Sequence, residues 1–287
     1  MTVNMCILDR ICKLIGGKLY RHKNHRTVGI NFKRRQMTHN ISETQTYYRH
    51  DDDYETIKAG FFDLYHNHPD LYDVFAKNQI MQSPLLDEIE RTLKSCDIKS
   101  GDFLDIGCGT GVMIELLAPR FPDINFIGID PVENSLRFAR NRCRDYKNTS
   151  FQLGKIEELE SVGSQFDVAF SSWGHIQWNI QGGMMERVVK ENGIAMLVNN
   201  WGADDDFEKL WPNEALGVFR DRINLLKKEG YEVQRLDSHL NLDNEVLFDS
   251  MSRIFGTEHL QKHRKTPFQI GIVLAFKKGK ALKSFEI

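Results

Sequence analysis

Three alternate glycines follow a short apolar stretch near the middle of the chain. Residues 103–106 read FLDI, and residues 107–111 read GCGTG. Glycine lets the backbone turn sharply and lets a ligand approach it closely. The N–H groups at the start of a following helix carry partial positive charge. The pattern therefore predicts a strand, a ligand-binding loop and a helix in succession.

A second acidic residue has the position of a ribose-binding group. Asp130 follows the apolar stretch Phe126–Ile129, which predicts the next strand. A carboxylate there can accept from both hydroxyls of a ribose. Asp105 would instead repel a phosphate, and Val112 stands where the dinucleotide fingerprint has its third glycine. We therefore expect a nucleoside that carries a cationic ammonium or sulfonium group.

The segment Leu104–Gly111 resembles the first motif of the class I S-adenosylmethionine-dependent methyltransferases. The resemblance implies S-adenosylmethionine as the cofactor. It also implies an α/β fold, a doubly wound, mostly parallel seven-stranded Rossmann-like sheet with a helical N-terminal lid. Asp105, Gly107 and Gly109 would contact the methionine part, and Asp130 the ribose. The other cofactor-binding residues that the resemblance implies are Cys108, Pro131, Ile156, Ser171 and Tyr48.

The third motif departs from the family pattern. Relatives commonly have Gly-Asp at the end of the third strand, whereas Gly154 is followed here by Lys155. A lysine cannot accept a hydrogen bond from the adenine amino group. We expect that contact at the backbone of Ile156 or at Glu157 instead. The departure also leaves open a regulatory protein that binds the cofactor without catalysis.

The candidate acceptor site follows the fourth predicted strand, Val168–Phe170, where residues 171–179 read SSWGHIQWN. Methyl transfer needs alignment and in some cases a base. His175 is the candidate general base, because the ordinary pKa of imidazole is near neutrality. Trp173 and Trp178 could wall the pocket or hold a cationic centre. The alternative is that His175 only orients the loop and that both tryptophans belong to the core.

Some methyltransferase classes are excluded by motifs that the chain lacks. It has no Asn/Asp-Pro-Pro-Tyr/Phe motif and no Pro-Cys pair, which argues against enzymes for exocyclic base amines and cytosine C5. Asp204–Asp206 follows the fifth predicted strand, where some catechol-type enzymes hold magnesium. No third ligand matches it, and such a run is typical of a solvated loop, so we predict no metal site.

The elements that must position these residues alternate along the chain. We expect a basic, poorly ordered arm over 1–41 and a helical lid over 42–98, with one helix capped by Ser83 and begun by Pro84. The cofactor-binding domain is expected over 99–287, with a helical lid insertion around 201–265. Within it, helices are predicted over 184–191 and 246–260. The late strand–helix–strand return predicts an antiparallel strand at one edge of the sheet.

Charge is distributed unevenly. The 287 residues include 38 Lys and Arg against 40 Asp and Glu, yet residues 1–37 carry nine basic side chains and one acidic one. The net charge of the arm is therefore about +8, and that of the remaining residues is about −10. The negative charge of the main body argues against binding of the nucleic-acid backbone there. The arm fits a poorly ordered tail, an organellar transit peptide or a membrane-surface helix.

Cysteine usage and hydropathy restrict the cellular compartments in which the protein is expected. Five cysteines lie far apart with no C-x-x-C pair, and no apolar run approaches the roughly 20 residues that span a bilayer. We predict a cytoplasmic protein, or an organellar one directed by the arm. The sequence does not indicate an oligomeric state.

The sequence thus predicts a methyltransferase that acts on an oxygen or nitrogen of a small-molecule acceptor. Alternatives are an RNA or protein methyltransferase tethered by the arm, and the non-catalytic regulatory protein.

Overall fold

The computed structural model describes residues 18–21, 28–31, 65, 67–156, 158, 165–173, 184–200, 205–211 and 213–278. The chain divides into two compact units, Met1–Gln45 and Thr46–Ile287. In the first unit, β1 (Lys18–Arg21) pairs antiparallel with β2 (Val28–Asn31). Among the described residues, no helix combines the length and the apolar character needed to cross a membrane.

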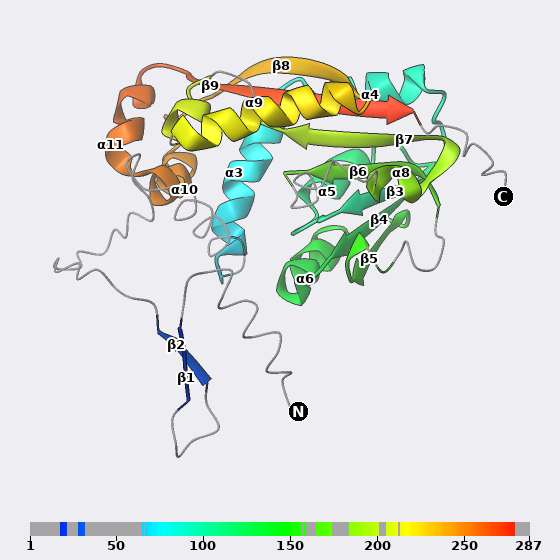
Figure 1. Cartoon of the computed structure of the whole chain (residues 1–287), viewed down its shortest axis with the longest axis horizontal. Coiled ribbons are helices and arrows are strands. Elements are labelled where there is room, and N and C mark those ends of the chain that lie inside the picture. Colours follow the sequence, from blue (N-terminus) through cyan, green and yellow to red (C-terminus); the bar gives the residue numbers. More distant parts are fainter. Residues whose placement is uncertain are drawn as a thin grey trace. The chain divides into compact units, whose positions relative to one another are not determined.

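The second unit contains a seven-stranded sheet with the order β5-β4-β3-β6-β7-β9-β8 (Figure 1). β9 is antiparallel to both of its neighbours, and all other neighbouring strands are parallel. The predicted doubly wound, mostly parallel sheet is therefore confirmed. The strands are β3 (Gly101–Ile106), β4 (Ile124–Asp130), β5 (Thr149–Leu153), β6 (Phe166–Ser172), β7 (Val189–Asn199), β8 (Glu232–Leu240) and β9 (Phe268–Lys278).

Helices cover both faces of the sheet. The α-helices are α3 (Pro69–Met81), α4 (Leu85–Ser95), α5 (Val112–Leu117), α6 (Glu133–Arg142), α8 (Met184–Arg187), α9 (Asn213–Lys228), α10 (Glu245–Phe255) and α11 (Thr257–Leu260). Two 3-10 helices are η2 (Glu208–Leu210) and η3 (Gln261–Arg264).

Successive strand residues point to opposite faces and so build two separate cores. Phe103 packs with α4, α5 and α6 on one face, and Leu104 packs with α8 and α9 on the other.

A third apolar cluster joins α3 to η2, α10 and α11. The ring of Phe75 stacks on that of Phe207 at 6.0 Å between centroids, and the hydroxyl of Ser250 donates to the carbonyl of Leu71 at 2.7 Å. Part of the predicted insertion over 201–265 therefore packs against α3, whereas α9 and β8 from the same range belong to the layers of the sheet. α3 lies across the end of the sheet at which the parallel strands finish (Figure 1).

The strand order differs from the prediction at one edge. The antiparallel strand, β9, takes the sixth place, and β8 forms the edge. β9 can enter there because it pairs along its length with β7 on one side and with β8 on the other.

Three predicted helix boundaries are also corrected. The helix predicted over 184–191 ends at Arg187, because Val189 opens β7 by pairing with Phe166. The helix predicted over 246–260 is divided at Gly256, whose φ of +87° ends α10. Pro84 is the N-cap of α4 rather than its first residue.

Gly128 in β4 gives a direct test of how tightly the strand packs beneath the glycine loop. A β-carbon added there would lie 2.6 Å from Cδ1 of Phe151 and 2.7 Å from Sγ of Cys108. Gly128→Ala should therefore lower the free energy of unfolding by about 1–3 kcal/mol through overpacking, measured by denaturant titration. At Gly154 the close atom is Oε2 of Glu158, the far end of a flexible side chain, so Gly154→Ala is the matched control. Equal stability of the two variants would contradict this packing.

Candidate functional site

The loop after β3 has the backbone geometry that its glycines allow. Gly107, Gly109 and Gly111 have φ values of +73°, +54° and +78°, in the left-handed region that favours glycine. At Gly111 an added β-carbon would lie 2.8 Å from Cβ of Ala139, so the loop also permits close packing of α6.

The amide groups of this loop are largely paired within the protein. The amides of Gly107 and Cys108 donate to the carbonyl of Ile129, at 2.8 and 3.2 Å. The amide of Gly109 donates to the Asp130 carboxylate at 3.0 Å, and that of Gly111 to the Cys108 carbonyl at 2.9 Å. A phosphate cradle needs several free amides. This loop therefore does not offer the arrangement that a pyrophosphate requires, in agreement with the expectation from its acidic residues.

Asp130 organises the site from the end of β4. Its side chain is 3% exposed. Oδ1 accepts from the amide of Val132 at 2.8 Å, and Oδ2 accepts both from the amide of Gly109 and from the hydroxyl of Tyr65 at 2.8 Å. Tyr65 was not singled out by the sequence, because the contact joins residues 65 positions apart.

Asp105 is unusual because its carboxyl group is buried without a compensating charge among the described residues. It lies in β3 between Gly128 of β4 and Phe170 of β6 and is 1% exposed. Within the part of the chain that the structure describes, neither of its carboxylate oxygens has a hydrogen-bond partner. Burial, and to a smaller extent the nearby carboxylate of Asp130, together raise the pKa of Asp105 to about 8. A buried, unpaired carboxyl is costly unless a charged partner or ligand compensates it. The position therefore favours a cationic ligand group.

The other predicted cofactor residues lie around the same end of the sheet. Cys108 is buried, and burial together with the carboxylate of Asp105 raises the pKa of its thiol, which keeps it protonated. Ser171 is buried near the end of β6. Pro131 and Lys155 are exposed, and the side chain of Ile156 is buried in the core. These placements leave their cofactor contacts as predictions.

A partly buried ionic network ties α3 to the glycine loop. Asp73 accepts from the hydroxyl of Thr110 in the loop and from the guanidinium of Arg142 in α6. One turn later, Nζ of Lys77 lies 3.0 Å from Oε2 of Glu115 in α5. The sequence pattern does not predict this network, although an acidic residue on an apolar helix face is a signal that points to Asp73.

A second buried network lies at the ends of β6 and β7. The indole N–H of Trp173 and the side-chain amide of Gln79 both donate to Oδ1 of Asn200, each at 2.6 Å. Nδ2 of Asn200 donates to the carbonyl of Gly271 at 2.7 Å. Trp173 has a φ of +50°, which is rare for an aromatic residue. The network thus holds one predicted acceptor-site tryptophan in a strained conformation.

Several predicted residues lie outside the described part of the chain: Tyr48, Glu157, His175, Trp178 and Asp204. Asp205, which was expected in a solvated loop, is instead buried and accepts from the amides of Glu208 and Gly271. Asp206 accepts from the amide of Gln269 at 3.1 Å. These two carboxylates therefore secure the segment before η2 to the start of β9.

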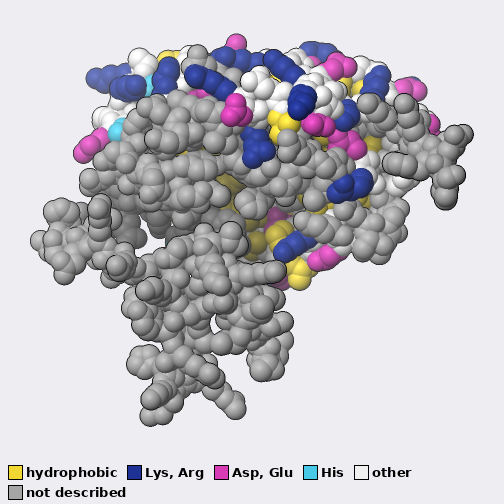
Figure 2. Space-filling model, viewed as in Figure 1, with side chains coloured by type: hydrophobic (Ala, Val, Ile, Leu, Met, Phe, Trp, Pro, Cys, Tyr) yellow, Lys and Arg dark blue, Asp and Glu magenta, His cyan; other side chains and the backbone are white. Residues whose placement is uncertain are grey.

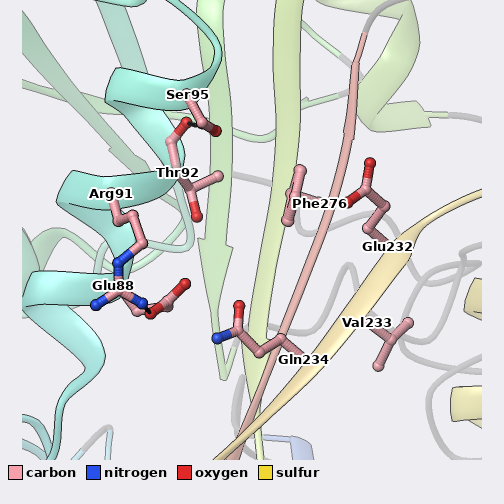
Figure 3. Close-up of a pocket in the computed structure, with 8 residues that line it drawn as sticks. All are labelled: Glu88, Arg91, Thr92, Ser95, Glu232, Val233, Gln234 and Phe276. Carbon is pink, nitrogen blue, oxygen red and sulfur yellow. Dashed lines mark hydrogen bonds and ion pairs between the residues drawn. The ribbon is translucent and has the colours of Figure 1, made fainter.

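A surface crevice lies elsewhere on the molecule, between α4 and the strands β8 and β9 (Figure 3). Glu88 and Arg91 of α4, which form an ion pair, stand on one wall, and Gln234 of β8 stands on the other. It is lined by no residue of the glycine loop. This crevice is therefore distinct from the cofactor site that the sequence predicts.

Comparison with known proteins identifies the central part of the chain. Residues 103–193 match the family model described as "Methyltransferase domain". The malonyl-[acyl-carrier protein] O-methyltransferase of Acetivibrio thermocellus is 36% identical over 128 residues, 43% of each chain. The ribosomal RNA small subunit methyltransferase H of Campylobacter jejuni is 35% identical over 80 residues, 27% of this chain and 25% of that one. The chain thus spans less than half the length of these curated relatives.

Among solved structures, a methyltransferase from Thiobacillus denitrificans in complex with S-adenosyl-L-homocysteine is 16% identical, with a TM-score of 0.45 over 71% of this chain and 96% of that one. The matched domain begins at β3, contains the glycine loop and Asp130, and ends within β7. Residues 103–193 of the chain therefore form a methyltransferase domain, and the relatives that match this part of the chain are methyltransferases.

Proposed function

We propose that the protein uses S-adenosylmethionine to methylate an oxygen or nitrogen of a small-molecule acceptor. The observation that carries the proposal is the buried carboxyl of Asp105, which has no hydrogen-bond partner among the described residues and lies beside a loop in which four backbone amides are already paired. Such a site disfavours a phosphate and is suited to the ammonium and sulfonium groups of this cofactor.

The chain's own residues would divide the work of binding. Asp105 would face the methionine part, Asp130 would accept from the ribose hydroxyls, and the three glycines would let the ligand approach the backbone. When bound, S-adenosylmethionine supplies a methyl group on a sulfonium, which an acceptor displaces in line. The protein must then align the acceptor and exclude water.

The loop that follows β6 would form the binding site for the methyl acceptor. Trp173 is fixed there by Asn200 and would form one wall of the acceptor pocket. His175 remains our candidate for the general base, two residues further along.

Two observations bear on the nature of the acceptor. On the face in Figure 2, the described Lys and Arg side chains are intermixed with Asp and Glu, whereas a surface for nucleic acid is typically a continuous basic patch. The relative from Acetivibrio thermocellus is named for O-methylation, which supports an oxygen acceptor.

Removal of the ribose-binding carboxylate tests the cofactor assignment. Asp130→Ala should weaken the binding of S-adenosylhomocysteine roughly tenfold or more, because hydrogen bonds to a charged group contribute about 1.5–3 kcal/mol. Isothermal titration calorimetry measures the affinity, and circular dichroism checks that the variant is folded. Asp123→Ala, which removes an exposed carboxylate between α5 and β4, is the control of equal charge change. Undiminished affinity in Asp130→Ala would refute the assignment.

The pKa of Asp105 predicts a pH dependence of binding. With a pKa of about 8, the carboxyl is mostly protonated in the free protein at neutral pH, whereas an ammonium ligand favours the ionised form. The affinity for S-adenosylhomocysteine should therefore increase as the pH rises from about 6 to 7.5, a range in which an α-amino group stays largely charged. Titrations in buffers with different heats of ionisation should detect proton release. Asp105→Asn should bind more weakly and lose this slope; an unchanged slope would rule out Asp105 as its source.

The same residue should limit the stability of the free protein. The pKa of Asp105 is raised from 3.8 to about 8 by folding, so the stability that its proton provides is present at low pH and is lost as the pH rises through about 8. Asp105→Asn should increase the free energy of unfolding at pH 8 by about 1–3 kcal/mol and change it little at pH 4. Denaturant titrations at both pH values measure this difference, with Asp123→Asn as the control. Destabilisation at pH 8 would show that the carboxylate is compensated in the free protein.

A further inference from the structure

The side chain of Tyr65 lies directly on the glycine loop. Its hydroxyl donates to Oδ2 of Asp130 at 2.8 Å. A β-carbon added to Gly109 would lie 3.1 Å from both Cε2 and the hydroxyl oxygen of the tyrosine. The ring therefore occupies the space that the absence of a side chain at Gly109 provides, and its hydroxyl meets the carboxylate that we assign to the ribose.

The bonds of Asp130 divide into fixed and exchangeable ones. The amides of Val132 and Gly109 belong to the backbone on either side of the site, and they hold the carboxylate in place. The hydroxyl of Tyr65, in contrast, is a side-chain donor on Oδ2. A ribose offers hydroxyl donors of the same kind, so a bound nucleoside and Tyr65 would compete for the same acceptor.

The side chain of Tyr65 stays protonated and therefore acts as a hydrogen-bond donor, not as a base. Burial raises the pKa of Tyr65 well above its ordinary value of 10, and the negative charge of Asp130 raises it further. The ring packs edge-on against Tyr72, with 5.4 Å between centroids. The neutral phenol thus offers Asp130 what a sugar hydroxyl offers, an uncharged O–H donor.

Exchange of this contact does not require the neighbouring helix to leave. α3 is tied to the glycine loop through Asp73 and to the end of β7 through the contact between Gln79 and Asn200. Tyr65 precedes Pro69, the residue with which α3 begins. The contacts that anchor α3 therefore do not depend on the contact between Tyr65 and Asp130.

We propose that Tyr65 competes with the cofactor for the ribose-binding carboxylate. Its hydroxyl donates a hydrogen bond to Asp130 in the free protein and is replaced by a ribose hydroxyl when the cofactor binds. The proposal rests on the proposed function, because it assumes that Asp130 receives the ribose. It assigns to Tyr65 the tuning of cofactor affinity, since every binding event must first break the contact with Asp130.

The test compares Tyr65→Phe with Tyr72→Phe in calorimetric titrations with S-adenosylhomocysteine. Tyr65→Phe keeps the ring and removes the competing donor, so it should bind the ligand roughly tenfold more tightly than the wild type. Tyr72→Phe removes a hydroxyl from the ring that packs against Tyr65, but not a donor that the structure places on Asp130, and its affinity should be unchanged. Tyr65→Ala, which also clears the ring from Gly109, should bind at least as tightly as Tyr65→Phe.

Thermal unfolding provides a second readout that a merely structural role would not produce. Without ligand, Tyr65→Phe should unfold at a lower temperature than the wild type, because one charge-assisted hydrogen bond is lost. With saturating S-adenosylhomocysteine, the increase in Tm should be larger for the variant than for the wild type.

The outcomes separate this inference from the proposed function. Equal or weaker binding by Tyr65→Phe overturns the competitor role, and the proposed function stands if the wild type still binds and Asp130→Ala binds more weakly. Absence of binding by the wild type and by both Tyr65 variants overturns both proposals. Binding that is detectable only in the Tyr65 variants supports both.

Discussion

The end of β4 holds the glycine loop in its shape. The carbonyl of Ile129 receives two loop amides, and the carboxylate of Asp130 receives a third. Two consecutive residues of one strand therefore fix the loop that follows the neighbouring strand. Because these bonds consume the amides, the charge that remains beside the loop is negative. The loop is thereby distinguished from the anion-binding loops that it resembles in its glycine content.

α3 connects the two halves of the site. Asp73 reaches the glycine loop, and Gln79, six residues later, reaches Asn200 at the end of β7. Asn200 in turn receives the indole of Trp173. A single helix thus relates the glycine loop to the ends of β6 and β7 through hydrogen bonds in the interior of the protein. Hydrogen bonds are directional, so the bond between the indole of Trp173 and Asn200 favours one orientation of the tryptophan. This bond can therefore stabilise the strained backbone of Trp173.

Local patterns predicted the parts of this structure that depend on neighbouring residues. The strand before Gly107, the helix after Gly111 and the acid after the next strand follow from apolar periodicity and from glycine chemistry. The contact between Tyr65 and Asp130 could not be predicted in this way, because it depends on how two distant segments are brought together. The same reason applies to Asn200, which lies in an apolar strand context and is recognisable as a hub only from its three partners. The position of β9 likewise depends on long-range pairing, which hydropathy does not encode.

The strand order also determines when this side of the sheet can assemble during synthesis of the chain. β8 is made before β9, yet its partner in the sheet is β9. Until β9 has left the ribosome, β8 has no neighbour to pair with, and β7 presents an open edge. The last described strand must enter between two segments that are already made, and it closes both edges in one step. Assembly of this side of the sheet is therefore a late and nonlocal event, during which unpaired strand edges are exposed to association with other chains.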